Sequence, residues 1–280
     1  MNTSHFTQGM DKHPVVVTRV AEQQWHALAD DQVVGRGDVS HRPDGRLFVS
    51  IDAWHGAVFD RLAEAMLADL PTPLHTLVDE TDHDLMSHWE RVGFAVRRRE
   101  WEYLVPTDPQ VTGLDAVRPP SGVRIVPAGE AEEGLLRALD RTVRAQVEAA
   151  VGWQEMPAEV LPRPDGTTVV DVSKYAVAAR SDEYVGLLRL APVPRQPRIG
   201  LVAVRAEQHR CGIARALLAQ VLGSLHRAGV RAASADVNES NRAATALFEG
   251  LGARRVGSNL ELVLRRPSAQ AAPAAQSSIA

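Results

Sequence analysis

The sequence predicts a mixed α/β protein made of two similar halves. Apolar residues make up 45% of the 280 residues and charged residues 24%, which is the composition of a soluble globular protein. Apolar side chains recur with the periods of strands and of helices in alternation. The same order of predicted elements then occurs twice, and the length suffices for about two domains.

Composition and charge exclude several classes of protein. The 31 Lys and Arg residues against 35 Asp and Glu give a formal net charge of −4, so no global positive field favours nucleic acid or anionic lipid. The single cysteine, Cys211, excludes an intramolecular disulfide and fits a reducing compartment. The longest apolar runs, such as 199–204, are far shorter than a bilayer-spanning segment. We therefore expect a cytoplasmic protein with no nucleic-acid, membrane or metal partner.

Changes in composition divide the chain into five segments. The first residues are polar, and the last ones contain no charged side chain, so neither end can bury enough apolar surface to fold. A proline-rich stretch without an apolar period lies near the middle. We expect disordered ends at 1–12 and 267–280, a linker at 107–121, and domains at 13–106 and 122–266.

The N-terminal half begins with a predicted hairpin of short apolar strands at 25–35, followed by a strand at 46–51. An amphipathic helix is predicted next, and after a strand at 74–78 comes a second helix that ends at Gly93. Their apolar stripes, which should pack on the sheet, are Val58, Leu62, Met66 and Leu70, and Leu85, Trp89 and Val92.

The C-terminal half repeats this order. Only this half is expected to carry an additional strand at 122–127 and a helix at 130–151 before the hairpin, so we interpret the N-terminal half as a truncated copy. The repeated elements are a hairpin at 175–186, a strand at 199–204, a helix over 213–225, a strand at 231–237, and a helix over 244–251 that ends at Gly252.

The loop after strand 199–204 predicts an anion site. Gly212 and Ala214 open the next helix, and such small residues let the backbone approach a ligand closely. The unpaired N–H groups of the first helical turn attract phosphate, and Arg210 and Arg215 add positive charge. For this segment alone, an ordinary strand-to-helix turn with a solvated basic face is the alternative.

A second stretch makes the pattern more specific. The loop is similar to the motif Gln/Arg-x-x-Gly-x-Gly/Ala, and the later stretch is similar to Asn-x-x-Ala-x-x-Leu-Tyr-x-x-x-Gly at Asn241, Ala244, Leu247 and Gly252. With these motifs the chain resembles the GCN5-related N-acetyltransferase (GNAT) superfamily. The resemblance implies two tandem GNAT-like domains, the N-terminal one truncated and degenerate, in a layout somewhat like that of mycothiol synthases.

The resemblance implies acetyl-CoA as the cosubstrate. The amides of 209–214 would hold its pyrophosphate, the backbone of the preceding strand would bind the pantetheine arm, and Asn241 would touch the same arm. The residues implied at this site are Val202, Val204, His209, Arg210, Cys211, Gly212, Ile213, Ala214, Arg215, Asn241, Ala244 and Phe248. Cys211 is expected to contribute its backbone only.

Three departures from the family pattern bear on binding and catalysis. His209 replaces the Gln or Arg of the loop, in which backbone amides are expected to make most of the contacts with the ligand. Phe248 stands where many members have a tyrosine thought to protonate the thiolate, and a phenyl ring cannot donate a proton. Arg198 or its apolar neighbours occupy the strand position of a glutamate base.

Asp236 is the candidate base that remains. In the branch that resembles the acetylases of ribosomal-protein alanine N-termini, the base is a carboxylate twelve residues before the tyrosine position, and here that residue is Asp236. Asp236 could instead simply cap or solvate the end of its strand. Glu155 and Glu159 lie in the region that lines the acceptor pocket in the family, where they compete as a base or bind a cationic substrate.

The expected function is therefore N-acetyl transfer from acetyl-CoA to a primary amine of a small molecule or peptide, in the C-terminal half. The N-terminal half lacks the small-residue spacing of the loop, so we expect it to be structural or to help form the acceptor pocket. A catalytically weak CoA-binding sensor or regulatory pseudoenzyme is the alternative, because of Phe248 and the missing strand glutamate. The sequence names neither the acceptor nor the oligomeric state.

Overall fold

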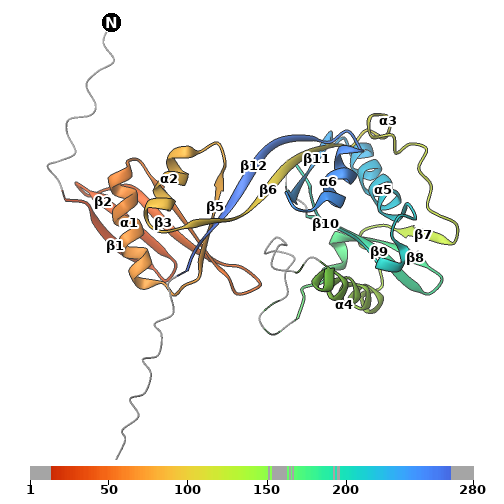
Figure 1. The fold of residues 1–280 in the computed structure, drawn as a ribbon, viewed down its shortest axis with the longest axis horizontal. Coiled ribbons are helices and arrows are strands. Elements are labelled where there is room, and N and C mark those ends of the chain that lie inside the picture. The colour runs from red at the N-terminus through yellow and green to blue at the C-terminus, as the bar shows by residue number, and fades with distance from the viewer. Residues whose placement is uncertain are drawn as a thin grey trace, which may run out of the picture.

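The computed structural model describes residues 14–150, 152, 163, 165, 167–191, 193 and 196–265. One mixed sheet runs through two lobes, and helices pack on it in each lobe (Figure 1). The predicted mixed α/β class is thus confirmed. The two ends that we expected to be disordered lie outside the described residues. None of the described helices is long and apolar enough to cross a membrane.

The N-terminal lobe is built as its apolar periods predict. The stripe of its first helix packs on the sheet, where Val58 and Leu62 are fully buried. The second helix begins at Asp82, whose carboxylate accepts the Leu85 N–H at 3.0 Å. The elements are β1 (Val16–Ala21), β2 (Gln24–Ala29), β3 (Gln32–His41), β4 (Leu47–Ala53), α1 (Gly56–Asp69), β5 (Leu74–Asp79), α2 (His83–Arg91) and β6 (Ala95–Pro106).

The expectation that only the C-terminal half has a first strand was wrong. Strand β1 pairs antiparallel with β2, as the corresponding C-terminal strand pairs with its own hairpin. Five of the six β1 residues are exposed, so its sequence shows no buried alternation. Between β1 and β2 there is only a tight turn at Glu22 and Gln23, so what the N-terminal copy lacks is the helix.

The C-terminal lobe follows the predicted order. The helix expected at 130–151 is observed, and it packs against β9. The elements are α3 (Pro109–Thr112), β7 (Val123–Val126), α4 (Glu133–Ala150), β8 (Tyr175–Arg180), β9 (Glu183–Ala191), β10 (Arg198–Val204), α5 (Ile213–Arg227), β11 (Ala232–Asn238), α6 (Arg242–Glu249) and β12 (Arg254–Leu264).

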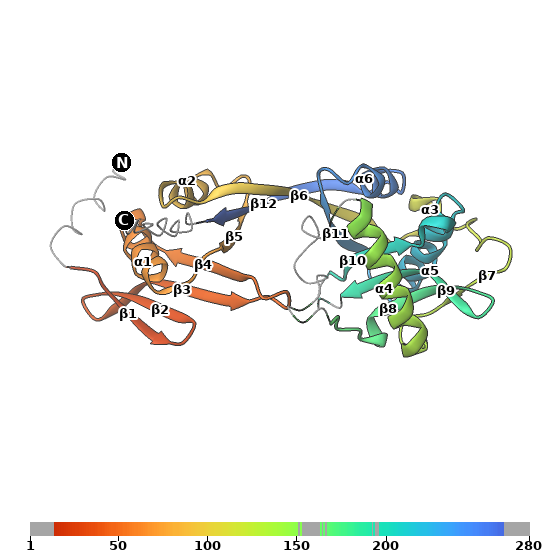
Figure 2. The same cartoon turned by 60° about the horizontal axis from the view of Figure 1, so that its bottom comes forward.

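The two halves exchange their last strands. The order across the sheet is β1-β2-β3-β4-β5-β12-β6-β11-β10-β9-β8-β7. Strand β12, from the C-terminal half, thus pairs with β5 of the N-terminal half, and β6 pairs with β11 of the C-terminal half. The two long strands also pair with each other and cross between the lobes (Figure 2). Each half therefore needs a strand of the other to complete its sheet.

The exchanged strands also complete the two cores. Strand β6 contributes Tyr103 and Val105, both fully buried, to the C-terminal core. Strand β12 contributes Leu260 and Leu262 to the N-terminal core. Since burying one such side chain contributes about 2 kcal/mol, each half is stabilised by residues of the other.

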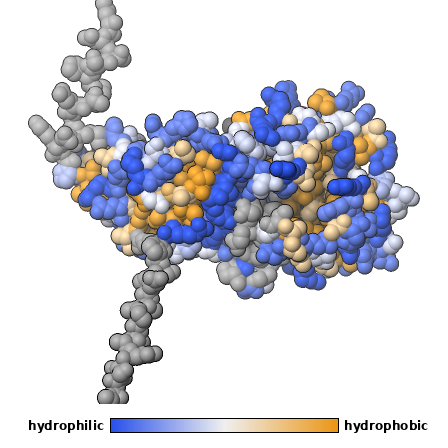
Figure 3. Space-filling view, in the orientation of Figure 1, coloured by the Kyte–Doolittle hydropathy of each residue, from blue (hydrophilic) through white to orange (hydrophobic). Residues whose placement is uncertain are grey.

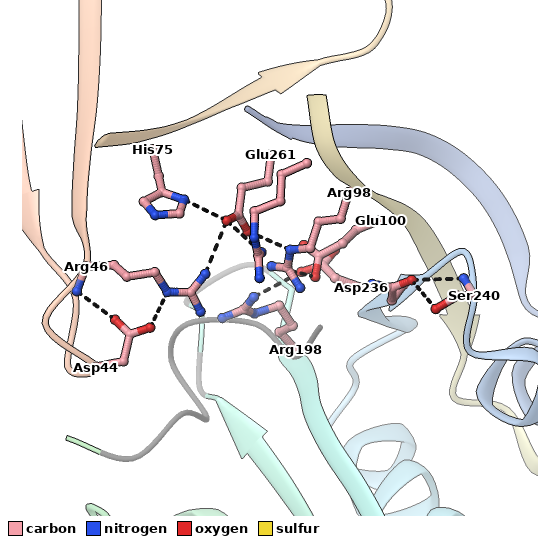
Figure 4. Close-up of polar contacts among 11 residues, drawn as sticks. Asp44, Arg46, His75, Arg98, Glu100, Arg198, Asp236, Ser240 and Glu261 are labelled. Carbon is pink, nitrogen blue, oxygen red and sulfur yellow. Dashed lines mark hydrogen bonds and ion pairs between the residues drawn. The ribbon is translucent and has the colours of Figure 1, made fainter. Parts of the chain in front are cut away.

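A buried charge cluster fixes β12 on the N-terminal lobe (Figure 4). The Glu261 carboxylate, 1% exposed, accepts hydrogen bonds from His75 Nδ1 at 2.9 Å, Arg97 Nη1 at 2.9 Å and Arg98 Nε at 2.6 Å. Arg46, from the hairpin between β3 and β4, reaches the same carboxylate at 3.2 Å. Burial alone would raise the pKa of Glu261, but these donors and charges outweigh it and lower the pKa to about 2.

The segment assigned as a linker packs on the C-terminal lobe. Asp108 caps α3 by accepting the Gln110 N–H at 2.9 Å, and Gly113 ends it in a left-handed conformation with φ of 64°. Leu114 is 4% exposed and belongs to the C-terminal core. This short connection therefore holds β6 and β7 in a defined relation.

Candidate active site

A cleft opens where β10 and β11 separate. The two strands pair in parallel only at Arg198–Ser234 and Ile199–Ala235, and the register of β10 against β9 shifts beside Gly200. Beyond this point the strands diverge and leave a cleft of about 690 Å³. In Figure 3 apolar surface is visible in the C-terminal lobe near α6 and β10, bordered by hydrophilic residues.

The loop before α5 forms one wall of the cleft. Gly212 has φ of 83°, a left-handed conformation that favours glycine, and Arg210 is left-handed as well, with φ of 60°. Among the described residues, a Cβ on Gly212 would have only Pro120 Cγ near it, at 4.0 Å, so they leave the space over this turn open. Because Gly212 has no side chain to cap α5, the first N–H groups of the helix are available to a ligand. This arrangement fits a pyrophosphate.

The strand that leads into this loop offers its backbone to the cleft. Val202 and Val204 line the cleft beyond the last β10–β11 pair. His209 also lines it, and its Nε2 lies 2.8 Å from the Val204 carbonyl oxygen. Since a carbonyl only accepts, the His209 ring donates through Nε2–H. Cys211 is exposed and is absent from the lining residues, and its Sγ lies 3.5 Å from the His209 carbonyl oxygen.

Helix α6 forms the opposite wall. Its N-cap is Asn241, whose side-chain oxygen accepts the Ala244 N–H at 3.0 Å. Ala244 and Phe248 also line the cleft. The Phe248 ring, 4% exposed, stacks on Tyr103 of β6 with 6.1 Å between ring centroids. The strand from the N-terminal half therefore supports the aromatic wall of the cleft from behind.

The candidate base is bound to a cation. Asp236 lies on β11 at the edge of the cleft, and its Oδ2 accepts a hydrogen bond from Arg198 Nη1 at 2.9 Å. Both side chains are partly exposed, at 21% and 29%. Figure 4 shows this ion pair beside the charge cluster around Glu261, on the same face of the sheet. Oδ2 is thus the Asp236 oxygen that the ion pair occupies.

The corresponding place in the N-terminal lobe is filled by a side chain. Strands β4 and β5 also pair in parallel at only two positions, and Gly56 begins α1 as Gly212 precedes α5. A Cβ on Gly56 would lie 2.7 Å from His88 Cε1, and the His88 ring stacks on Phe59 with 4.9 Å between centroids. The imidazole therefore occupies the space over the first turn of α1.

The structure brings most of the predicted CoA-site residues together. Val202, Val204, His209, Arg210, Gly212, Ile213, Ala214, Arg215, Asn241, Ala244 and Phe248 line the cleft, with Asp236. Glu155 and Glu159 lie outside the described residues. Sequence reasoning missed Gly200 and Asn238, which line the cleft without belonging to either motif. Within the described ranges, no three His, Cys, Asp or Glu side chains are grouped as metal ligands.

Comparison with known proteins agrees with this geometry. Residues 145–253 match the family model "Acetyltransferase (GNAT) family", so this part of the chain is a GNAT acetyltransferase domain. This stretch runs from the end of α4 through α6 and contains the whole cleft. The resemblance stated from the motifs is thereby confirmed. A search of the curated proteins found no match.

Solved structures extend the likeness to both lobes. A GCN5-related N-acetyltransferase from Sphaerobacter thermophilus is 20% identical, with a TM-score of 0.60 over 89% of this chain and 83% of that chain. A tandem GNAT protein from the clavulanic acid biosynthesis pathway is 17% identical, with a TM-score of 0.61 over 88% and 83%. A GCN5-related N-acetyltransferase from Kribbella flavida is 13% identical, with a TM-score of 0.53 over 91% and 90%. At these identities the likeness shows the tandem GNAT fold.

Proposed function

We propose that this protein is an acetyl-CoA-dependent N-acetyltransferase that acetylates a primary amine of a small molecule or peptide in the C-terminal cleft. The observation that carries the proposal is the left-handed Gly212 at the open N-terminus of α5. It lies next to the part of β10 beyond the last pair with β11. The amides of this turn would hold the pyrophosphate, and Val202 and Val204 would hold the pantetheine arm. Acetyl-CoA supplies the activated acetyl group as a thioester.

Acetyl transfer from the thioester to an amine has three chemical requirements. The amine must be neutral when its nitrogen bonds to the carbonyl carbon, the carbon–sulfur bond must break, and the departing thiolate must receive a proton. Asp236 is our candidate to take the amine proton, directly or through water. Phe248 cannot supply the proton to sulfur, so we assign that step to water. The apolar wall of α6 would exclude other water from the thioester.

A catalytically weak CoA-binding sensor is the second candidate. The observations that favour it are Phe248 at the tyrosine position and the ion pair that holds Asp236 to Arg198. Both candidates require the same CoA site, so CoA binding does not separate them.

A screen of primary amines with acetyl-CoA, which measures the release of free thiol, tests the proposal. Release that depends on one class of amine supports the enzyme. Tight acetyl-CoA binding with no release above the rate of hydrolysis, for any amine, supports the sensor.

A further inference from the structure

Helix α4 contacts the turn that leads into the loop of the cleft. This turn covers residues 205–208, between the end of β10 and the left-handed Arg210. The side-chain oxygen of Gln146, on α4, accepts the Ala206 N–H at 2.8 Å. The side-chain nitrogen of Gln146 donates to Glu207 Oε2 at 3.3 Å. One glutamine of α4 thus binds both the backbone and a side chain of the turn.

Two further contacts hold the ends of the same turn. Its first residue, Arg205, places Nη1 2.8 Å from Glu183 Oε2, at the start of β9. Its last residue, Gln208, accepts a hydrogen bond at Oε1 from Arg180 Nη1 of β8, at 2.7 Å. Gln208 lines the cleft, and the chain continues directly into His209, which lines it as well. The position of the turn therefore sets the position of the loop.

Helix α4 reaches the turn from the face of the sheet that α5 does not cover. Leu187 of β9 belongs to the core that contains the buried side chains of α4, whereas its neighbour Leu188 belongs to the core that contains those of α5. Because successive residues of a strand point to opposite faces, the two helices cover opposite faces. Gln146 therefore links the face under α4 to the loop that opens α5.

The N-terminal half lacks both the helix and the turn. Its chain passes from β1 to β2 without a helix that corresponds to α4. Only Trp54 and His55 separate β4 from α1, whereas residues 205–212 separate β10 from α5. In the N-terminal half the space over the start of the helix is occupied by His88. The helix and the open loop thus occur together in one half and are missing together from the other.

We propose that Gln146 is a positioning residue for acetyl-CoA, through which α4 holds the loop of 209–214 in the conformation that binds the pyrophosphate. Ordering a loop on binding costs free energy, so a loop that is already held in its bound conformation binds more tightly. The coupling is reciprocal, and a ligand that orders the loop also stabilises the contacts that hold it. This inference rests on the proposed function and adds a residue that acts on the cosubstrate through the loop.

Gln146→Leu tests the proposal, because it keeps the approximate size of the side chain and removes both contacts. Its affinity for acetyl-CoA is measured by calorimetric titration. Amide hydrogen exchange is followed along the chain, with and without acetyl-CoA. The informative amides are those of Gln208 and His209, which donate within the turn, to Arg205 O at 2.9 Å and Ala206 O at 3.2 Å, and not to Gln146.

In the free protein, Gln146→Leu should speed exchange at Gln208 and His209 and leave β9 and the thermal midpoint unchanged. Its Kd for acetyl-CoA should rise on the order of tenfold, the effect of losing two hydrogen bonds that order the loop. In the wild type, acetyl-CoA should slow exchange in the last turn of α4 as well as in the loop, and the variant should lose the effect on α4. Gln110→Leu, at an exposed glutamine of α3, is the matched control and should behave like the wild type.

Unchanged exchange at Gln208 and His209 in Gln146→Leu would overturn the proposal, and so would an unchanged Kd for acetyl-CoA. Protection of α4 by acetyl-CoA that is missing from the wild type, or that persists in the variant, would also contradict it. Faster exchange throughout α4 and β9, with a lower thermal midpoint, would show that Gln146 only stabilises the lobe. A wild type that fails to bind acetyl-CoA would instead overturn the proposed function, whatever the exchange of the free protein shows.

Discussion

Arg198 Nη1 of β10 lies 2.9 Å from Asp236 Oδ2 of β11, at the level where these two strands stop pairing. Arg198, which stands at or next to the strand position where the family pattern calls for a glutamate, thus binds the neighbouring carboxylate. The ion pair orients Asp236, and in the proposed reaction its Oδ1 would take the amine proton. It bears directly on whether Asp236 can act as the base.

Asp236→Asn is expected to lower kcat by about a hundredfold, the usual contribution of a general base, with little change in acetyl-CoA affinity. Steady-state turnover and the Kd for acetyl-CoA check this. Glu239→Gln, one residue beyond the end of β11, is the control and should keep its activity. Near-wild-type turnover of Asp236→Asn across the pH range would show that Asp236 is not the base.

Phe248→Tyr is expected to raise turnover or leave it unchanged, since a phenol at this place could protonate the thiolate. Phe248→Ala should instead destabilise the protein by about 3–5 kcal/mol, because it removes a buried ring that stacks on Tyr103. Turnover of the tyrosine variant and urea unfolding of the alanine variant are the measurements. A well-folded tyrosine variant without activity would show that the apolar ring itself is required.

The buried Glu261 should make the protein sensitive to acid. Its pKa is about 2 in the folded protein against an ordinary value of 4.5, so the folded state favours the carboxylate. A lowered folded pKa contributes stability that is complete above pH 4.5 and is lost as the pH falls toward 2, by about 3 kcal/mol in all.

Urea unfolding between pH 5 and pH 2 measures this loss. In Glu261→Gln, the free energy of unfolding should lack this part of its decrease with falling pH. The variant should also be less stable at neutral pH, since it leaves the surrounding arginines without their counter-charge. Glu64→Gln, on the exposed side of α1, should keep the wild-type dependence of stability on pH. An identical slope in Glu261→Gln would contradict the role of the cluster.

A fragment of residues 122–280 is expected to aggregate or to lose acceptor turnover. The fragment lacks β6, so β11 loses its pairing with that strand, and the C-terminal core loses Tyr103 and Val105. The unpaired edge and the uncovered apolar surface both favour association. Size-exclusion chromatography and the thiol-release assay check this outcome. A monomeric, soluble and fully active fragment would show that the N-terminal half is dispensable.

Local patterns in the sequence predicted the elements and the glycine turn before α5, because helix periods and small-residue spacing act over a few neighbouring residues. The stripe of Val58 and Leu62 and the turn at Gly212 are of this kind. The exchange of β6 and β12 was not predicted. The alternation of apolar and polar residues in a strand shows that one face is buried, but not which half of the protein covers that face. The same holds for the Arg198–Asp236 pair and for His88 over Gly56, which depend on contacts between distant segments.

Calorimetric titration with acetyl-CoA tests the central claim most directly. We predict one site per chain in the wild type and no binding in Gly212→Glu, because a carboxylate at this left-handed turn would collide with and repel the pyrophosphate. Gly229→Glu is the matched control, since Gly229 has φ of 81° at the other end of α5 and no described atom lies within 4 Å of a Cβ added there. It should bind acetyl-CoA like the wild type. Two equivalent sites, no binding to the wild type, or unchanged affinity in Gly212→Glu would contradict the assignment of the C-terminal cleft.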